Sequence, residues 1–137
     1  MGILMDTVKI LFIDDDIKAL DLFKTMLEAE GFTVFTACNG MAGIKTAVSK
    51  NPDLIILDIK MPQFDGFEVL KCLKADTNVR NIPVILLTAY SSENDRQRAE
   101  LLGAAEYLVK PIDPEKMVMV FLEVLLSMGA TKEYDHT

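Results

Sequence analysis

The chain has 137 residues, of which 50% are hydrophobic and 26% charged, so it fits one globular domain, and extensive disorder is excluded. Its formal net charge is −7 at pH 7, which excludes the basic surface needed for direct nucleic-acid binding. No apolar stretch approaches the roughly 20 residues of a membrane span and the first residues do not resemble a signal peptide, so we expect a cytoplasmic protein without a membrane partner.

Five short apolar runs predict β-strands, at residues 8–13, 33–37, 54–57, 84–87 and 107–109. Most of these runs are continuous rather than alternating, which is typical of strands that are buried on both faces of a sheet. The pattern therefore favours a sheet that is covered on both sides.

The segments between these runs have the period of α-helices, and we predict that their apolar stripes face the core. The stripes are Ile17, Leu20, Phe23 and Leu27; Met41, Ile44 and Val48; and Phe67, Leu70 and Leu73. Ser91 and Ser92 are predicted to cap a fourth helix that ends at Gly103, and we expect a fifth helix from Pro114 to about Met128.

The predicted order is strand then helix, repeated five times. Strands that alternate with helices favour parallel pairing, right-handed crossovers and helices on both faces of the sheet. We therefore predict one α/β domain over residues 1–128, with its core at about 8–126, followed by a flexible tail at 129–137.

Polar residues follow four of the five predicted strands. Asp14 and Asp15 follow the first run, Asp58 the third, Thr88 the fourth and Lys110 the fifth. Parallel α/β sheets bind ligands beyond the carboxyl ends of their strands, so we expect these side chains to gather at one edge of the sheet.

This set of side chains predicts a phosphoryl-transfer site. Clustered carboxylates repel one another and stay ionised when a cation lies among them, and oxygen ligands with room for water suit Mg²⁺. Lys110 supplies a positive charge and Thr88 a hydroxyl donor for a phosphoryl group that a carboxylate accepts as an aspartyl phosphate. Asp16 is interpreted instead as a helix cap, and Asp65-Gly66 as the turn that starts the third helix.

Four segments carry a resemblance to a known family: ILFIDDD at 10–16, LDIKMPQFDG at 57–66, LTA at 87–89 and YLVKP at 107–111. In residue type, order and spacing they resemble the receiver domains of bacterial response regulators, which act in two-component signal transduction. The resemblance extends from about residue 9 to residue 126. It implies a flavodoxin-like (βα)5 doubly wound fold, similar to that of chemotaxis regulators, with a parallel sheet of order 2-1-3-4-5.

The resemblance also implies a role for each residue of the site. Asp58 is the expected phosphoacceptor, Thr88 and Lys110 the groups that contact the phosphoryl oxygens, and Asp15, Asp58 and the backbone carbonyl of Lys60 the direct ligands of Mg²⁺, with Asp14 acting through a metal-bound water. Mn²⁺ is expected to substitute for Mg²⁺.

Further residues are assigned to the switch by the same resemblance. Tyr107 is expected to turn inward together with Thr88, and the peptide bond between Lys110 and Pro111 to be cis. The side chains of Lys60 and Tyr90 are expected to tune the lifetime of the phosphoryl group.

The implied partners are a sensor histidine kinase or a phosphotransfer protein as donor, and an effector that binds the face of the fourth helix, fifth strand and fifth helix. The protein is then a signalling switch that catalyses only its own phosphorylation and slow dephosphorylation, rather than an enzyme with a separate substrate.

The last helix carries two apolar rows. Met117, Val118, Phe121, Val124 and Leu125 form the predicted buried stripe, and Met119, Leu122 and Leu126 form the second row. The second row is predicted to face a homodimer mate, an effector or another domain. The alternative is that neighbouring loops and the fourth helix cover it.

Two other functions stay open at this point. A binding module of the same fold that is never phosphorylated is disfavoured, because the residues of the site are all present. A metal-dependent phosphatase with an aspartyl intermediate, as in the haloacid dehalogenase family, is also disfavoured. Such enzymes carry a second aspartate two residues after the nucleophile, where this chain has Lys60.

Overall fold

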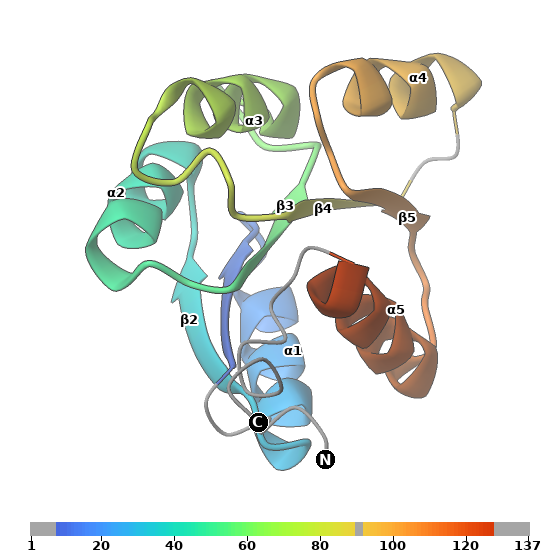
Figure 1. The fold of residues 1–137 in the computed structure, drawn as a ribbon. Coiled ribbons are helices and arrows are strands. Elements are labelled where there is room, and N and C mark those ends of the chain that lie inside the picture. Colours follow the sequence, from blue (N-terminus) through green and yellow to red (C-terminus); the bar gives the residue numbers. More distant parts are fainter. Residues whose placement is uncertain (1–7, 90–91, 128–137) are drawn as a thin grey trace.

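The computed structural model describes residues 8–89 and 92–127, and strands and helices alternate strictly in them (Figure 1). The elements are β1 (Lys9–Ile13), α1 (Ile17–Ala29), β2 (Thr33–Ala37), α2 (Gly40–Lys50), β3 (Leu54–Asp58), α3 (Gly66–Ala75), β4 (Val84–Thr88), α4 (Glu93–Leu101), β5 (Glu106–Val109) and α5 (Pro114–Ser127). The expectations for Tyr90, Ser91, Met128 and the tail at 129–137 lie outside the described residues.

The strands form one parallel sheet in the order β2-β1-β3-β4-β5, which confirms the predicted topology. The strand at 33–37 has the predicted bounds, and each of the other four differs by one residue at one end, because backbone pairing does not stop where hydrophobicity stops. Asp58 pairs with Leu87 and Thr88 pairs with Val109, so both polar residues are the last of their strands rather than the first beyond them. At the other end of β1, Val8 is buried but lies outside the strand.

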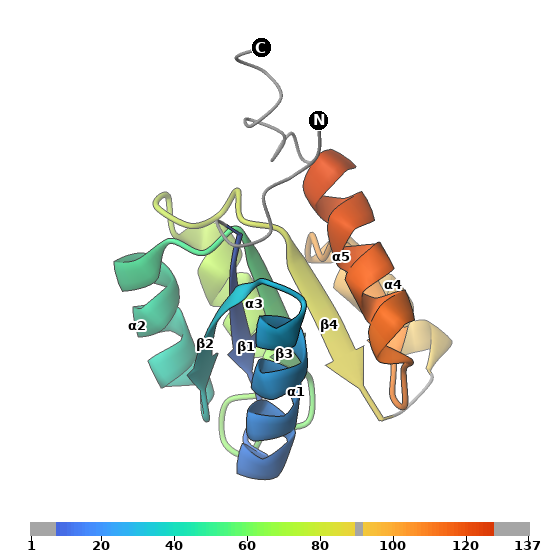
Figure 2. The ribbon, with the colours of Figure 1, turned by 90° about the horizontal axis from the view of Figure 1, so that it is seen from below.

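The sheet lies between two layers of helices, with α1 and α5 on one face and α2, α3 and α4 on the other (Figures 1 and 2). Successive residues of β1 point to opposite layers: Ile10 and Phe12 pack with α1 and α5, whereas Leu11 and Ile13 pack on the other side. Every residue of β3 and β4 is buried, which confirms that the continuous apolar runs are central strands. Burial of each large apolar side chain in these two strands stabilises the fold by about 1.5–3 kcal/mol.

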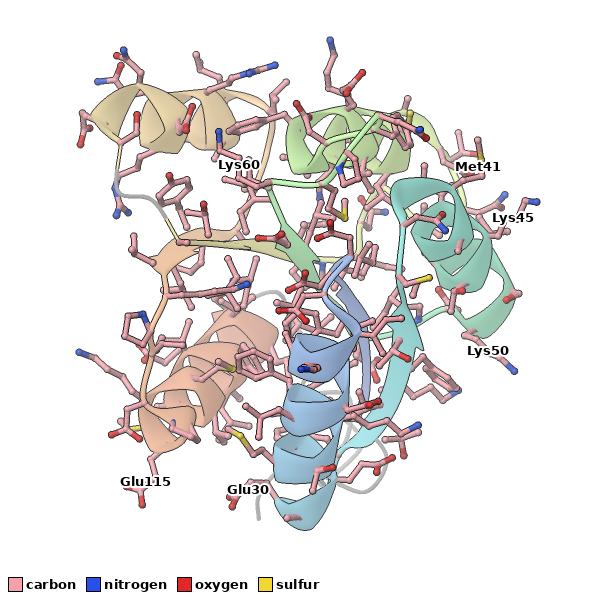
Figure 3. The ribbon with its side chains drawn as sticks, turned by 180° about the vertical axis from the view of Figure 1, so that it is seen from behind. Glu30, Met41, Lys45, Lys50, Lys60 and Glu115 are labelled. Carbon is pink, nitrogen blue, oxygen red and sulfur yellow. The ribbon has the colours of Figure 1, made fainter. Side chains whose placement is uncertain are left out.

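The predicted core face of α2 is correct only for Ile44, which packs partly against the core. Met41 and Val48 are exposed, and Met41 points away from the sheet in Figure 3. The buried residues of this helix are Gly40, Gly43 and Ala47. A Cβ atom on Gly43 would lie 2.5 Å from Cδ1 of Ile13, so the helix approaches the sheet too closely for a larger side chain. Small residues, rather than large apolar ones, form the packed face.

The stripe of α1 is correct only beyond its first turn. Leu20 and Leu27 are buried and Phe23 is partly buried, but Ile17 is 62% exposed. Ile17 is the first residue of the helix and lies beyond the carboxyl end of β1, where the sheet no longer covers it.

Three helices begin at side-chain caps, of which Asp16 and Ser92 were predicted as caps and Asp65 only as part of a turn. The Asp16 carboxylate accepts hydrogen bonds from the backbone N–H groups of Lys18 and Ala19 at the start of α1, so Asp16 is a cap as expected. Asp65 forms a reciprocal capping box with Glu68 at α3, and the Ser92 hydroxyl accepts from the N–H of Asp95 at α4. Each cap stabilises its helix by about 1 kcal/mol.

The five predicted core residues of α5 are all buried. In the second row, Met119 is 63% exposed and Leu126 is also exposed, whereas Leu122 packs partly against the core. The exposed apolar surface of α5 is therefore smaller than the sequence predicts. At 14 residues, α5 is far below the length of a membrane span, and none of the other helices in the described part of the chain is long and apolar enough for one either.

Candidate phosphoryl-transfer and metal site

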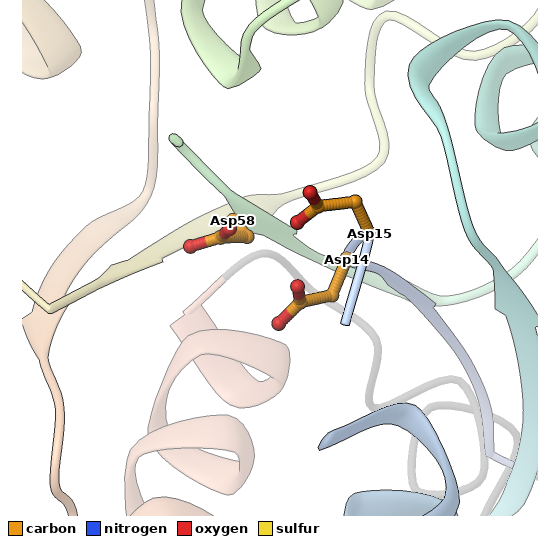
Figure 4. A group of neighbouring side chains, drawn as sticks. All are labelled: Asp14, Asp15 and Asp58. Atoms are coloured by element: carbon orange, nitrogen blue, oxygen red, sulfur yellow. The ribbon is translucent and has the colours of Figure 1, made fainter. Parts of the chain in front are cut away.

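Three carboxylates meet at the carboxyl end of the sheet (Figure 4). Asp14 and Asp15 follow β1 and Asp58 ends β3, and these two strands are neighbours in the sheet. One oxygen atom from each side chain lies within 4.8 Å of the others. The structure therefore brings together the three residues that the sequence predicts as a metal site.

The chemistry of this group fits Mg²⁺. All the donors are oxygen atoms, they carry negative charge, and Asp15 is exposed, so water can complete the coordination of a small cation. A divalent cation would also reduce the repulsion among carboxylates that the fold holds together.

Contacts to its backbone N–H and to both carboxylate oxygens hold Asp14 in place. Its side chain is 1% exposed, and its backbone N–H donates to the carbonyl of Ala37, which continues the ladder between β1 and β2. Oδ1 accepts from the N–H of Asp16 at 2.9 Å, and Oδ2 lies 3.2 Å from Nζ of Lys110. Each oxygen of this carboxylate therefore already has one donor, and the water-mediated contact of Asp14 with a metal stays a prediction.

The environment of Asp58 disfavours its charge. Burial is the main cause that raises its pKa from 3.8 to about 6, and the nearby Asp14 and Asp15 carboxylates raise this pKa further. Lys110 and the N–H of Ile59 oppose the shift. Without a cation, Asp58 therefore keeps its proton to a higher pH than an ordinary aspartate does, and a bound metal would compete with that proton.

Lys110 reaches this cluster from β5, which is two strands away from β3. Nζ lies 3.7 Å from Oδ1 of Asp58, in addition to its contact with Asp14. Its backbone N–H donates to the carbonyl of Thr88, which ties the end of β5 to the end of β4. The peptide bond between Lys110 and Pro111 is cis, in agreement with the resemblance.

Thr88 and Tyr107 lie on the side of the site formed by β4 and β5. Thr88 is buried and is one residue beyond Leu87, the strand partner of Asp58. The Tyr107 ring is already buried in this structure and belongs to the core beneath α2, α3 and α4. The movement of this ring together with Thr88 stays a prediction.

Lys60 lies in the loop after β3, and its side chain projects toward the space between α3 and α4 (Figure 3). It lines a cleft there together with Met61, Asp95 and Arg98. The carbonyl of Ile59 accepts from the N–H of Met61 at 3.0 Å, so the backbone turns tightly around Lys60. The role of the Lys60 carbonyl as a metal ligand stays a prediction.

Gly66 has a role at the site that sequence reasoning missed. A Cβ atom at this position would lie 2.5 Å from the backbone oxygen of Asp58 and 2.8 Å from Cα of Ile59. The first turn of α3 therefore rests directly on the backbone of the phosphoacceptor candidate. The Asp-Gly pair that begins α3 was interpreted only as a turn. The signal that could have revealed this contact is the spacing of the pair from Asp58 along the sequence.

We expect Gly66→Ala to destabilise the protein by about 1–3 kcal/mol, because the added methyl group pushes α3 away from Asp58. Mg²⁺ affinity should fall together with stability. Urea unfolding and calorimetric titration with Mg²⁺ measure the two effects. Gly103→Ala is the control, since its positive φ of 92° makes alanine unfavourable but leaves room for the methyl group, so stability should fall without a change in Mg²⁺ affinity. Parent-like Mg²⁺ affinity in Gly66→Ala would contradict this role.

Mg²⁺ affinity should depend on pH through Asp58. Because the raised pKa lies at about 6, protons compete with the metal as the pH falls through that value. We expect the association constant to fall about tenfold between about pH 7.5 and about pH 5. Calorimetric titration at the two pH values measures this. Asp58→Asn should bind Mg²⁺ more weakly at both pH values, and most of the change in its association constant between them should be lost. A flat profile in the parent protein would show that Asp58 does not titrate with the metal.

Comparisons with known proteins agree with this geometry. Residues 10–121 match the response regulator receiver domain family. The DNA-binding dual master transcriptional regulator RpaA of Synechocystis is 42% identical over 110 residues, which cover 80% of this chain and 46% of RpaA. The polar-differentiation response regulator DivK of Brucella anthropi is 34% identical over 109 residues, which cover 80% of this chain and 89% of DivK. The chemotaxis protein CheY4 of Vibrio cholerae has a matching structure, with a TM-score of 0.82 and 31% identity over 86% of this chain and 98% of CheY4.

The chain therefore belongs to the response regulator receiver domains of two-component systems. Domains of this family are signalling switches that interact with histidine kinases and with effectors. The chain spans less than half the length of RpaA, so the activity of that whole protein is not carried over to it.

Proposed function

We propose that this chain is a receiver switched by phosphorylation, in which Asp58 takes a phosphoryl group from the phosphohistidine of a sensor histidine kinase or a phosphotransfer protein. The observation that carries the proposal is the convergence of three carboxylates and one ammonium group from β1, β3 and β5 at one edge of the sheet. A nucleophilic carboxylate, a cation site and a lysine are the components of a site that forms an aspartyl phosphate. This phosphoryl transfer is expected to take place in the cytoplasm.

In the transfer step, a carboxylate oxygen of Asp58 attacks phosphorus while the bond from phosphorus to the donor imidazole nitrogen breaks. The imidazole leaves with the electron pair of that bond. Asp15, Asp58 and the Lys60 carbonyl would hold Mg²⁺ directly and Asp14 through water, and Mn²⁺ would fit the same oxygen donors. The metal supplies charge neutralisation for the transferring group.

Lys110 and Thr88 act on the product of this step. The Lys110 ammonium, which already faces Asp58, pairs with one phosphoryl oxygen, and the Thr88 hydroxyl donates to another. Hydrolysis by water later returns Asp58 to its free form. The long side chain of Lys60 beside the site can shield or admit that water, so slow dephosphorylation belongs to the same proposal.

The switch would act on the face of α4, β5 and α5. Phosphorylation draws Lys110 and Thr88 toward the new dianion and shifts a pre-existing equilibrium of this face, typically with a coupling of about 1–3 kcal/mol. Met119 and Leu126 on α5 are exposed apolar residues that a homodimer mate or an effector could cover. Sedimentation with and without phosphorylation tests the homodimer, and a chain that stays monomeric in both states would contradict it.

The proposal is tested by incubation with Mg²⁺ and acetyl phosphate, followed by mass measurement of the intact protein. We expect one added phosphoryl group that is stable in acid, is lost in base, and does not form when Mg²⁺ is removed with a chelator. A parent protein that never gains the group would favour a binding module without phosphorylation. Rapid turnover of unrelated phosphomonoesters would favour a phosphatase.

A further inference from the structure

Helix α4 has almost no apolar attachment to the rest of the domain. Its sequence is ENDRQRAEL, and Ala99 is the one buried residue among Glu93–Leu101. Leu101, its one large apolar residue, is 88% exposed. A single small side chain buries little area, so polar or aromatic contacts must contribute to the position of this helix.

Two arginine side chains supply such contacts, one toward β5 and one toward α3. The Arg96 guanidinium lies 4.8 Å from the centre of the Tyr107 ring, and its Nη1 donates to the Tyr107 carbonyl at 3.3 Å. The Arg98 guanidinium lies 4.2 Å from the centre of the Phe67 ring on α3. Ala99 therefore lies between two cation–π contacts that reach different elements.

The two contacts are not equivalent. Phe67 is a buried residue of α3, whereas Tyr107 lies in the strand that leads directly to Lys110. Tyr107 also interacts with the first turns of α4 beyond Arg96. Burial and the Asp95 carboxylate raise the pKa of its phenol, while Arg96 and the N–H of Ser92 oppose that rise. The start of α4 therefore lies against this ring.

We infer that Arg96 is a positioning residue that holds α4 against β5 through Tyr107, whereas Arg98 anchors the other side of α4 to α3. The consequence for signalling rests on the proposed function. If phosphorylation changes the position of β5 or of the Tyr107 ring, the Arg96 contact transmits that change to α4, and the Arg98 contact provides the pivot. A single cation–π contact alters an equilibrium by about 2- to 30-fold, which is a suitable size for a reversible switch.

Hydrogen exchange of α4 amides in the unphosphorylated chain tests the contact directly. We expect Arg96→Gln and Tyr107→Leu each to raise the local opening of α4 by about 2- to 30-fold, and the double variant to open no more than the more affected single variant. Arg80→Gln, which removes an exposed arginine outside α4, should leave exchange unchanged. Parent-like exchange in Arg96→Gln, or full additivity in the double variant, would overturn the inference.

Titration of the Tyr107 phenol separates this role from general support of the helix. Arg96→Gln should raise the pKa of Tyr107 further, because a nearby positive charge is lost, whereas Arg98→Gln should leave this pKa unchanged while it also loosens α4. Equal pKa values in the two variants would contradict the assignment.

A final comparison with acetyl phosphate keeps this inference distinct from the proposed function. Arg96→Gln should still gain the phosphoryl group by mass, but the change of α4 exchange that phosphorylation produces in the parent should be lost. If the parent gains no phosphoryl group, the proposed function fails and the exchange result in the unphosphorylated chain still decides the Arg96 contact. If α4 responds equally in parent and variant, Arg96 does not transmit the signal.

Discussion

Asp58→Asn should abolish the phosphoryl adduct and, without divalent cations, make the protein more stable at neutral pH. The first effect follows from the loss of the nucleophilic carboxylate. The second follows from the raised pKa of Asp58, which lies at about 6 in the folded protein against 3.8 ordinarily. For a raised pKa, the stability contribution is complete below 3.8 and is lost as the pH rises through about 6. At neutral pH the ionised carboxylate therefore opposes folding, and asparagine has the same shape without that charge.

The size of this stabilisation is limited by solvent at the open edge of the site. The shift corresponds to at most about 3 kcal/mol, and we expect about 1–2 kcal/mol, or a rise of about 4–8 °C in Tm. Thermal unfolding with a chelator at about pH 7 and about pH 4 measures it, and the difference should shrink at the lower pH. Asp21→Asn, at an exposed position of α1, should change Tm little. A variant that is less stable than the parent at neutral pH would contradict the electrostatic explanation.

Lys110→Met should have the opposite effect on stability. It removes the ammonium group that faces both Asp14 and Asp58, and Asp14 is almost completely buried. A broken buried ion pair costs about 3–5 kcal/mol, and because the Lys110 side chain is 26% exposed we expect about 2–3 kcal/mol without Mg²⁺. The phosphoryl adduct should form at least about 100-fold more slowly, as expected when a preorganised charge is lost from a transfer site.

Mg²⁺ should rescue part of the stability of Lys110→Met, because a cation among the carboxylates replaces the lost positive charge. The rise of Tm on addition of Mg²⁺ should then be larger in the variant than in the parent. Lys9→Met is a suitable control, since this exposed lysine lies in β1 at the opposite end from the site. Equal Tm changes with Mg²⁺ in Lys110→Met and the parent would show that Lys110 and the metal do not share the same carboxylates.

These two substitutions expose a property of the site as a whole. The fold holds three carboxylates close together, and one lysine only partly offsets their charge. Such an arrangement reduces stability in the absence of ligands and favours the binding of cations and of a phosphoryl group. The same electrostatics explains both a gain of stability in Asp58→Asn and a loss in Lys110→Met.

Much of the fold and the site could be predicted because both depend on strong local patterns. The continuous apolar runs at β3 and β4 correspond to strands that are fully buried. Asp58, Thr88 and Lys110 come at the ends of three neighbouring parallel strands, so their approach follows from topology alone. The cap at Asp16 was predictable because its hydrogen bonds are local in sequence.

The features that sequence reasoning missed depend on contacts between distant elements. The core face of α2 was assigned to large apolar residues, but Gly43 allows the helix to pack closely on Ile13. In the sequence, Arg96 and Arg98 look like charged residues on a solvent-exposed helix surface. Only the structure shows that they contact aromatic rings on β5 and α3.

The identity of the phosphorylated side chain is the most direct test of the central claim. The protein is phosphorylated with acetyl phosphate and Mg²⁺ and treated with sodium borohydride, which reduces an aspartyl phosphate to homoserine. Peptide sequencing by mass spectrometry then locates the homoserine. We predict homoserine at Asp58 and at none of the other aspartates. Homoserine at Asp14 or Asp15, or a phosphoryl group that resists borohydride, would contradict the assignment of Asp58 as the phosphoacceptor.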